Sequence, residues 1–101
     1  MEDLVPRLSG KAARVLDLLA EKTDMYGLEL VAASKGSLKR GTVYVTLARM
    51  EAKGYVSSRQ ESKSPHSIGL PRRLYRITPL GSRVRDAWGL LRATLALEGA
   101  R

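Results

Sequence analysis

The chain has 101 residues, of which 44% are hydrophobic, and a formal net charge of +8. Its length is that of one small domain, and its hydrophobic content excludes a wholly disordered basic tail. The sequence has no apolar run approaching the roughly 18 residues of a membrane span, no apolar signal segment at its start and no cysteine. We therefore expect a single cytoplasmic domain without disulfides, thiolate metal sites or membrane contact.

Positive charge is concentrated in one part of the chain. The segment from Lys35 to Arg92 has 13 basic and 3 acidic residues, a net charge of +10, whereas residues 1–34 have 4 basic and 6 acidic residues, a net charge of −2. This asymmetry is typical of a protein that binds a polyanion such as a nucleic acid.

A first helix is predicted at residues 10–22, with Ser9 as its N-cap. Its apolar residues recur at helical spacing. They are Ala12, Val15, Leu16 and Leu19.

A second, shorter helix is expected to start at Thr23 or Asp24 and to end at Lys35-Gly36, because glycine commonly follows a helix end. We expect it to bury Tyr26, Leu28 and Val31. Both helices are interpreted as scaffold.

A third helix is predicted from about Arg40 to Lys53, with Gly54 after its end. On a helical wheel its core stripe is Val43, Leu47 and Met50. Tyr44 and Glu51 flank this stripe. The outer face consists of Thr42, Val45, Arg49 and Lys53, with Thr46 at its margin. This face combines short hydroxyls, a small apolar group and cations, and it has no acid at its centre. Such a surface favours a helix that binds in a nucleic-acid groove over one that only faces solvent.

Two antiparallel strands are predicted at residues 55–59 and 72–78, joined by a polar linker that we expect to be a mobile loop. Tyr75 and Ile77 share one face of the second strand by period-two alternation. Thr78 and Pro79 then form a helix-starting pair, with threonine as the N-cap and proline at the first helical position.

A last helix is predicted at residues 79–97, and it has more apolar surface than one small domain readily covers. We interpret this surface as a partner face, formed by a short heptad seam. The seam consists of Val84, Trp88, Leu91 and Leu95. Together with Leu80, these are the candidate dimerisation residues. For Trp88, packing against the first helix and contact across a dimer remain equally open.

Three stretches resemble the PadR family of winged helix-turn-helix transcriptional regulators. MYGLEL (25–30) stands where family members have a Tyr-Gly or Gly-Tyr pair at the start of the second helix. LKRGTVYVTLARMEAKGYV (38–56) is similar to the family's recognition helix, in which Gly-Thr-Leu-Tyr leads into an apolar-basic helix. GLPRRLYRITPLG (69–81) is similar to the end of the family's wing. Together the matches extend over residues 12 to 81, in the family's order and spacing.

The resemblance implies an α+β fold, in which residues 1–78 form a winged helix of three helices and a two-stranded wing, and residues 79–101 form a C-terminal dimerisation helix. It also implies a homodimer that binds double-stranded DNA, usually as a repressor, at an inverted-repeat operator. The third helix would then enter the major groove and the wing would follow the backbone or a minor groove. The candidate DNA-binding residues are Ser37, Lys39, Arg40, Thr42, Tyr44, Val45, Thr46, Arg49, Lys63, Arg72 and Arg73. Arg76 is equally suited to pair with an acid inside the monomer.

Other functions find less support in the residues. The single histidine, His66, has no second ligand nearby, and no acidic pair has the spacing of a catalytic site, so we expect no enzyme, metal or cofactor. The alternative to DNA readout is a basic winged-helix module for RNA or protein interaction. Because some PadR-like regulators sense planar aromatic compounds, the resemblance also allows a small aromatic effector, bound by Trp88 with Leu91 between subunits.

Overall fold

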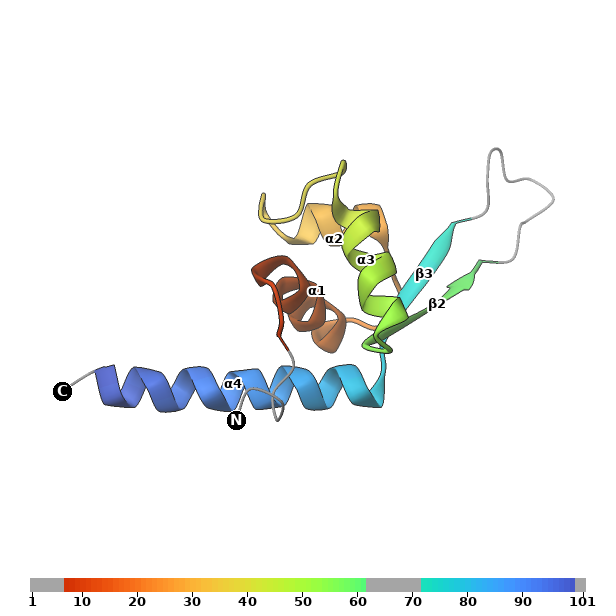
Figure 1. The fold of residues 1–101 in the computed structure, drawn as a ribbon. Helices are drawn as coiled ribbons and strands as arrows, with labels where there is room; N and C mark the ends of the chain where they lie inside the picture. The colour runs from red at the N-terminus through yellow and green to blue at the C-terminus, as the bar shows by residue number, and fades with distance from the viewer. Residues whose placement is uncertain (1–6, 62–71, 100–101) are drawn as a thin grey trace.

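The computed structural model describes residues 7–61 and 72–99, which form four helices and one three-stranded sheet (Figure 1). The elements are α1 (Gly10–Glu21), β1 (Met25–Tyr26), α2 (Gly27–Ala33), α3 (Val43–Ala52), β2 (Val56–Gln60), β3 (Arg73–Ile77) and α4 (Pro79–Gly99). The expected α+β class, with three helices, a wing and a long C-terminal helix, is confirmed. The predicted mobile loop falls largely on residues 62–71, which lie outside the described residues.

Helix α1 is the centre of the fold, because it contacts all three other helices and β3. The Ser9 hydroxyl accepts a hydrogen bond from the Ala12 amide at 3.1 Å, as expected of an N-cap. The predicted apolar stripe of α1 is buried. It packs in one core cluster with residues from every other element, including Met25, Leu30, Leu47, Met50, Val56, Tyr75 and Val84.

Helix α2 begins later than predicted. Asp24 has a φ of 60°, in the left-handed region, and Met25–Tyr26 is extended, so a helix cannot start at Thr23 or Asp24. In the helix that starts at Gly27, Leu30 is the leucine that reaches the core. The prediction that Leu28 is buried is wrong, since its side chain is 48% exposed.

Helix α3 is shorter than expected at its start, because residues 40–42 form a turn before Val43. Its core stripe of Val43, Leu47 and Met50 is buried, as predicted. Its end is also confirmed: Gly54 has a φ of 81° and donates to the Glu51 carbonyl, while the Tyr55 amide donates to the Met50 carbonyl. This pair of hydrogen bonds is the Schellman motif that a glycine in the left-handed region permits.

The sheet has one strand more than the two that were predicted. Its order is β1-β3-β2, and both pairings are antiparallel. In the predicted hairpin, Val56 pairs with Ile77 and Gln60 with Arg73. The extra strand is too short to show a sequence period, and it pairs through Met25 with Tyr75. It joins the start of α2 to the hairpin.

Helix α4 is fastened to the rest of the fold at its N-terminal end. The Thr78 hydroxyl accepts from the Gly81 amide at 2.9 Å and donates to the Gly54 carbonyl, so the predicted cap also ties α4 to the end of α3. Arg85 donates to Asp17 on α1 at 2.9 Å. The C-terminal part of α4 extends beyond the other helices (Figure 1). None of the described helices combines the length and apolar character that crossing a membrane requires.

Candidate nucleic-acid interface

The outer face of α3 is open to solvent. Thr42, Val45 and Arg49 are all exposed, with Val45 51% exposed at the middle of the face. Ala48 and Ala52, which were not predicted as part of this face, are exposed beside them. Because these alanines are short, they let another molecule approach the helix backbone closely.

The turn before α3 presents two cations. Lys39 and Arg40 are exposed, and the Lys39 carbonyl accepts from the Val43 amide at 2.9 Å, so the turn leads directly into the helix. The Ser37 hydroxyl donates to the Ser34 carbonyl at 3.0 Å and therefore shapes this turn. Backbone amides at the start of a helix attract anions, which adds to the two positive side chains.

A cleft of about 560 Å³ lies between Tyr44 of α3, the start of α2 and the wing strand β3. Tyr44 lies on its α3 side, half exposed, with its ring so close to Gly27 that a side chain there would collide with it. Arg72 and Arg73 lie on its wing side. The structure thus brings together three of the predicted site residues from two distant segments. The predicted contact Lys63 and the histidine His66 lie outside the described residues.

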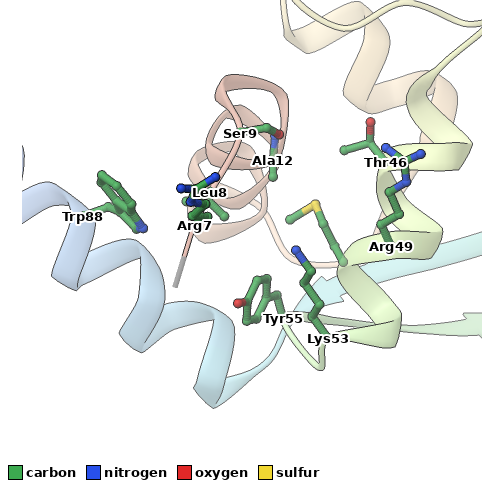
Figure 2. Close-up of a pocket in the computed structure, with 10 residues that line it drawn as sticks. Arg7, Leu8, Ser9, Ala12, Thr46, Arg49, Lys53, Tyr55 and Trp88 are labelled. Carbon is green, nitrogen blue, oxygen red and sulfur yellow. The ribbon is translucent and has the colours of Figure 1, made fainter. Parts of the chain in front are cut away.

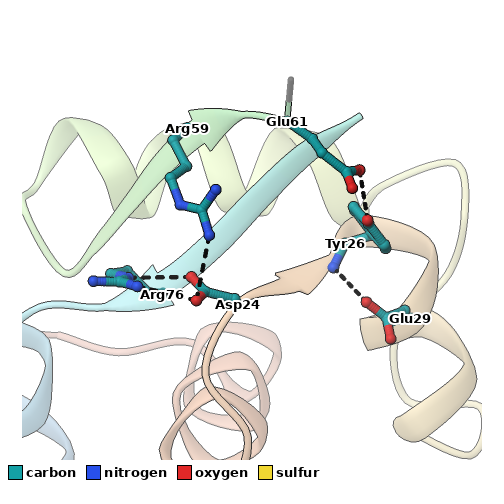
Figure 3. A network of polar contacts seen from close by, with 6 residues as sticks. All are labelled: Asp24, Tyr26, Glu29, Arg59, Glu61 and Arg76. Atoms are coloured by element: carbon teal, nitrogen blue, oxygen red, sulfur yellow. Dashed lines mark hydrogen bonds and ion pairs between the residues drawn. The ribbon is translucent and has the colours of Figure 1, made fainter. Parts of the chain in front are cut away.

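A salt-bridge cluster links Asp24, just before β1, to both strands of the wing (Figure 3). Asp24 accepts from Arg76 at 3.0 Å and lies 3.4 Å from Arg59. The hydrogen bond from Arg76, helped by the charges of both arginines, holds the pKa of Asp24 below its usual value. The expected internal pairing of Arg76 is confirmed, and Arg59 is paired in the same way.

The far end of the described hairpin is attached to α2 through Tyr26, which sequence analysis did not include in the site. The Tyr26 hydroxyl donates to Glu61 at 2.5 Å, and the Arg72 guanidinium lies over the Tyr26 ring, 5.0 Å from its centre. Next to Arg72, Arg73 of β3 donates to the hydroxyl of Ser58 on β2 at 2.9 Å. Arg72 and Arg73 are therefore both held within the monomer while remaining exposed.

A second cavity, of about 480 Å³, lies on the opposite side of α3 (Figure 2). Trp88 of α4 lines it, together with Tyr55 and Met50. Its other lining residues are Arg7, Leu8, Ser9, Ala12, Thr46, Arg49 and Lys53. Thr46, which was predicted at the margin of the DNA-binding face, is therefore one of the residues that line this cavity.

The candidate dimerisation residues separate into two groups. Val84 is 4% exposed and belongs to the monomer core, and Trp88 packs partly against that core. Leu91 is half buried, whereas Leu80 and Leu95 are exposed, with Leu95 57% exposed. Leu90, outside the predicted seam, is more exposed still at 71%.

Acidic side chains are scattered over the described part of the molecule. Within residues 7–61 and 72–99, no three His, Asp or Glu side chains gather closely enough to hold a metal ion. Glu51, the one acid of α3, points toward β2, where it accepts from both the amide and the hydroxyl of Ser58.

The helix order, the exposed third helix and the hairpin beside it define a winged helix-turn-helix protein, the class in which the third helix and wing contact nucleic acid. The sequence profile described as the Transcriptional regulator PadR-like family matches residues 15–87, so the chain belongs to the PadR-like family. The members of this family are transcriptional regulators and not enzymes.

Solved structures agree with this assignment. A PadR family transcription regulator from Clostridium difficile R20291 is 25% identical, with a TM-score of 0.67 over 88% of this chain and 97% of that one. The PcaV regulator of Streptomyces coelicolor is 19% identical, with a TM-score of 0.74 over 89% of this chain and 61% of that one. Bacillus subtilis PadR, solved with operator DNA, is 21% identical, with a TM-score of 0.65 over 75% of this chain and 44% of that one. The last two show the fold alone. No curated protein matches the sequence.

Proposed function

We propose that the protein is a sequence-specific repressor that binds an inverted-repeat operator in double-stranded DNA as a homodimer. Helix α3 enters the major groove, and the wing follows the backbone or a minor groove. Lys39 and Arg40 lie near phosphates at the start of α3, while Thr42, Val45 and Arg49 face the base edges. In a symmetric dimer the half-sites are about one helical turn apart, roughly 34–36 Å.

The observation that supports DNA binding most directly is the sign of the charge on α3. Its exposed outer face contains Arg49 and no acid, and Glu51 is held toward β2 by two hydrogen bonds from Ser58. A negative groove can therefore approach this face without meeting a carboxylate. The exposed arginines of the wing extend the positive surface past the cleft.

The proposal is tested by titrating the protein against a fluorescent duplex from its own promoter at several salt concentrations. We expect affinity about 10³-fold higher than for a scrambled duplex. We also expect a log–log salt slope steeper than about −2, since each neutralised phosphate contributes close to −0.9. Equal affinity for any duplex and for RNA would instead support the alternative of a non-specific winged-helix module.

The homodimer is proposed to form through the C-terminal part of α4. Leu90 and Leu95 are exposed in this part of α4. The C-terminal part of α4 extends beyond the other helices (Figure 1). Exposed leucines on a helix that extends from the fold are stabilised when a second copy covers them. Val84 is left out of this surface, because the monomer core already buries it.

Replacing Leu95 by Asp is expected to shift the protein from dimer to monomer, because a carboxylate in an apolar interface loses its hydration. The molar mass measured by light scattering over a range of protein concentrations checks this. Since Leu95 is exposed in the monomer, the far-ultraviolet circular dichroism should stay unchanged. A variant that remains as dimeric as the original chain would place the interface elsewhere.

We also propose a small aromatic acid as an effector, on the evidence of the cavity beside Trp88. Trp88, Tyr55 and Met50 offer an apolar surface for a planar ring, and Arg49 and Lys53 offer positive charge for a carboxylate. Because Arg49 also lies on the outer face of α3, the ligand and DNA would compete for the same guanidinium. Leu91, expected to join Trp88, is not among the residues that line the cavity.

Trp88 is the only tryptophan of the chain, so its fluorescence reports on this cavity directly. We expect benzoate to quench the emission saturably and neutral benzyl alcohol, matched in size, to do so much less. Lys53→Ala should weaken the effect of benzoate. Equal, unsaturable quenching by both compounds would contradict an effector site for aromatic acids.

A further inference from the structure

Two opposite charges face each other at the far end of the described hairpin. The Glu61 amide donates to the Arg72 carbonyl at 2.7 Å, which continues the strand register in which Gln60 pairs with Arg73. Opposite charges at directly facing positions of an antiparallel pair ordinarily attract each other. A bond between Glu61 and Arg72 would cancel the positive charge at the mouth of the cleft.

Tyr26 engages both of these groups from α2's side. Its hydroxyl donates to the Glu61 carboxylate at 2.5 Å (Figure 3), and its ring lies beneath the Arg72 guanidinium, 5.0 Å from ring centre to the guanidinium carbon. A guanidinium over a tyrosine ring at this distance is held by a cation–π interaction. The charge of Arg72 also acts on the carboxylate of Glu29, which is paired with Lys22. One side chain therefore contacts both the Glu61 carboxylate and the Arg72 guanidinium.

Tyr26 is itself firmly placed. Its backbone amide donates to the Glu29 carboxylate at 3.0 Å, and its strand position pairs with Leu74 of β3. Glu29 is fixed in turn by Lys22 at 3.1 Å. The hydrogen bond to Glu61 also raises the pKa of the Tyr26 hydroxyl, so the phenol keeps the proton that it donates.

We propose that Tyr26 is a positioning residue for DNA binding, which keeps Glu61 from neutralising Arg72 so that Arg72 can meet a backbone phosphate at the cleft between α3 and the wing. This role of Tyr26 rests on the proposed function, because it explains how Arg72 stays available for one phosphate contact of the proposed DNA-binding surface. Arg72, Tyr44 and Tyr26 all line that cleft, whose volume of about 560 Å³ is large enough for a phosphate group. Glu29 lines it too, but this carboxylate already has Lys22 as its ion-pair partner.

The test is a set of variants titrated against the operator duplex. Tyr26→Leu removes both the hydroxyl and the ring, so Glu61 turns to Arg72. We expect roughly tenfold weaker binding, as for a lost hydrogen bond to a charged group, and a salt slope shallower by about 0.9 per protomer. Adding Glu61→Gln should restore most of the affinity and the slope, because glutamine carries no charge to cancel Arg72.

A purely structural role for Tyr26 would not give this rescue, so failure of Glu61→Gln to restore binding overturns the proposal. Unchanged affinity in Tyr26→Leu overturns it as well. In an Arg72→Ala background, Tyr26→Leu should cause no further loss. If Tyr26→Leu unfolds, Tyr26→Phe replaces it: the ring remains, Glu61 is released, and the smaller loss should again be rescued by Glu61→Gln.

The proposed function and this inference fail in different ways. If the unmodified protein does not prefer its promoter duplex over a scrambled one, the proposed function is wrong. If it does prefer that duplex and the Glu61→Gln rescue is absent, DNA binding stands and only the role of Tyr26 is rejected.

Discussion

Arg49→Glu is expected to abolish specific DNA binding, with affinity for the operator duplex lowered by about a hundredfold or more. Arg49 is exposed on the outer face of α3, where the proposed mode of binding places the DNA groove. The substitution removes a cation and puts a carboxylate against phosphates, and such a like-charge contact costs several kcal/mol. Fluorescence anisotropy with the operator duplex measures the loss.

The matched control is Arg83→Glu, which makes the same charge change at an exposed site on α4. It should weaken binding by less than about tenfold, because salt screens charges that are more than a Debye length from the DNA. Both variants should keep the molar mass of the unmodified protein. Equal losses in the two variants would mean that overall charge, and not contact by α3, determines affinity.

Gly81→Ala should destabilise the fold by about 3 kcal/mol, in the upper range for inserting an atom into a packed site. Gly81 is buried in the first turn of α4, and a Cβ there would collide with the backbone carbonyl of Tyr55. That carbonyl accepts from the Thr78 amide at 3.1 Å and cannot move without breaking the junction between α3 and α4. Thermal unfolding followed by circular dichroism should show a Tm lower by roughly 15 °C.

Gly89→Ala, in the same helix, should act in the opposite direction. A Cβ at Gly89 meets no atom within 4 Å, and α4 is helical on both sides of it. Alanine is better than glycine in a helix interior by about 0.8 kcal/mol, so the Tm should rise. If both alanines lowered the Tm alike, the close contact at Gly81 would not be the cause of its effect.

The parts of the fold that could be predicted from sequence are those with a strong local signal. Val43, Leu47 and Met50 recur at helical spacing, and all three are buried in α3. Thr78 and Pro79 mark the start of α4, where the threonine hydroxyl accepts from the Gly81 amide. Caps and apolar periods depend on a few neighbouring residues, so they are visible without the rest of the chain.

The start of α2 could not be predicted in this way, because the left-handed backbone of Asp24 is fixed by tertiary contacts. Asp24 binds Arg59 and Arg76, which lie in strands far along the chain. Without them, nothing in the sequence distinguishes a helix that starts at Asp24 from one that starts at Gly27. The expected core included Leu28, which is exposed, and omitted Leu30, which is buried.

The same limit applies to the candidate site. The outer face of α3 followed from its helical wheel alone, so Arg49 and Val45 could be named in advance. The cluster of Tyr26, Glu61 and Arg72 could not, since only the folded hairpin brings these residues to one place. The seam of α4 was predicted as one partner face, but Val84 is buried in the monomer core and Leu95 is exposed.

Asp24 also changes what the arginines of the wing contribute to the thermodynamics of DNA binding. When a free arginine reaches a phosphate, it releases a cation that was condensed on the DNA, and this release is a source of affinity. Arg59 and Arg76 already have Asp24 as an internal counterion. The +10 charge of residues 35–92 therefore overstates the number of ions that binding sets free. Within the described hairpin, Arg59 and Arg76 are paired with Asp24, whereas Arg72 and Arg73 are the arginines that we propose to contact the DNA.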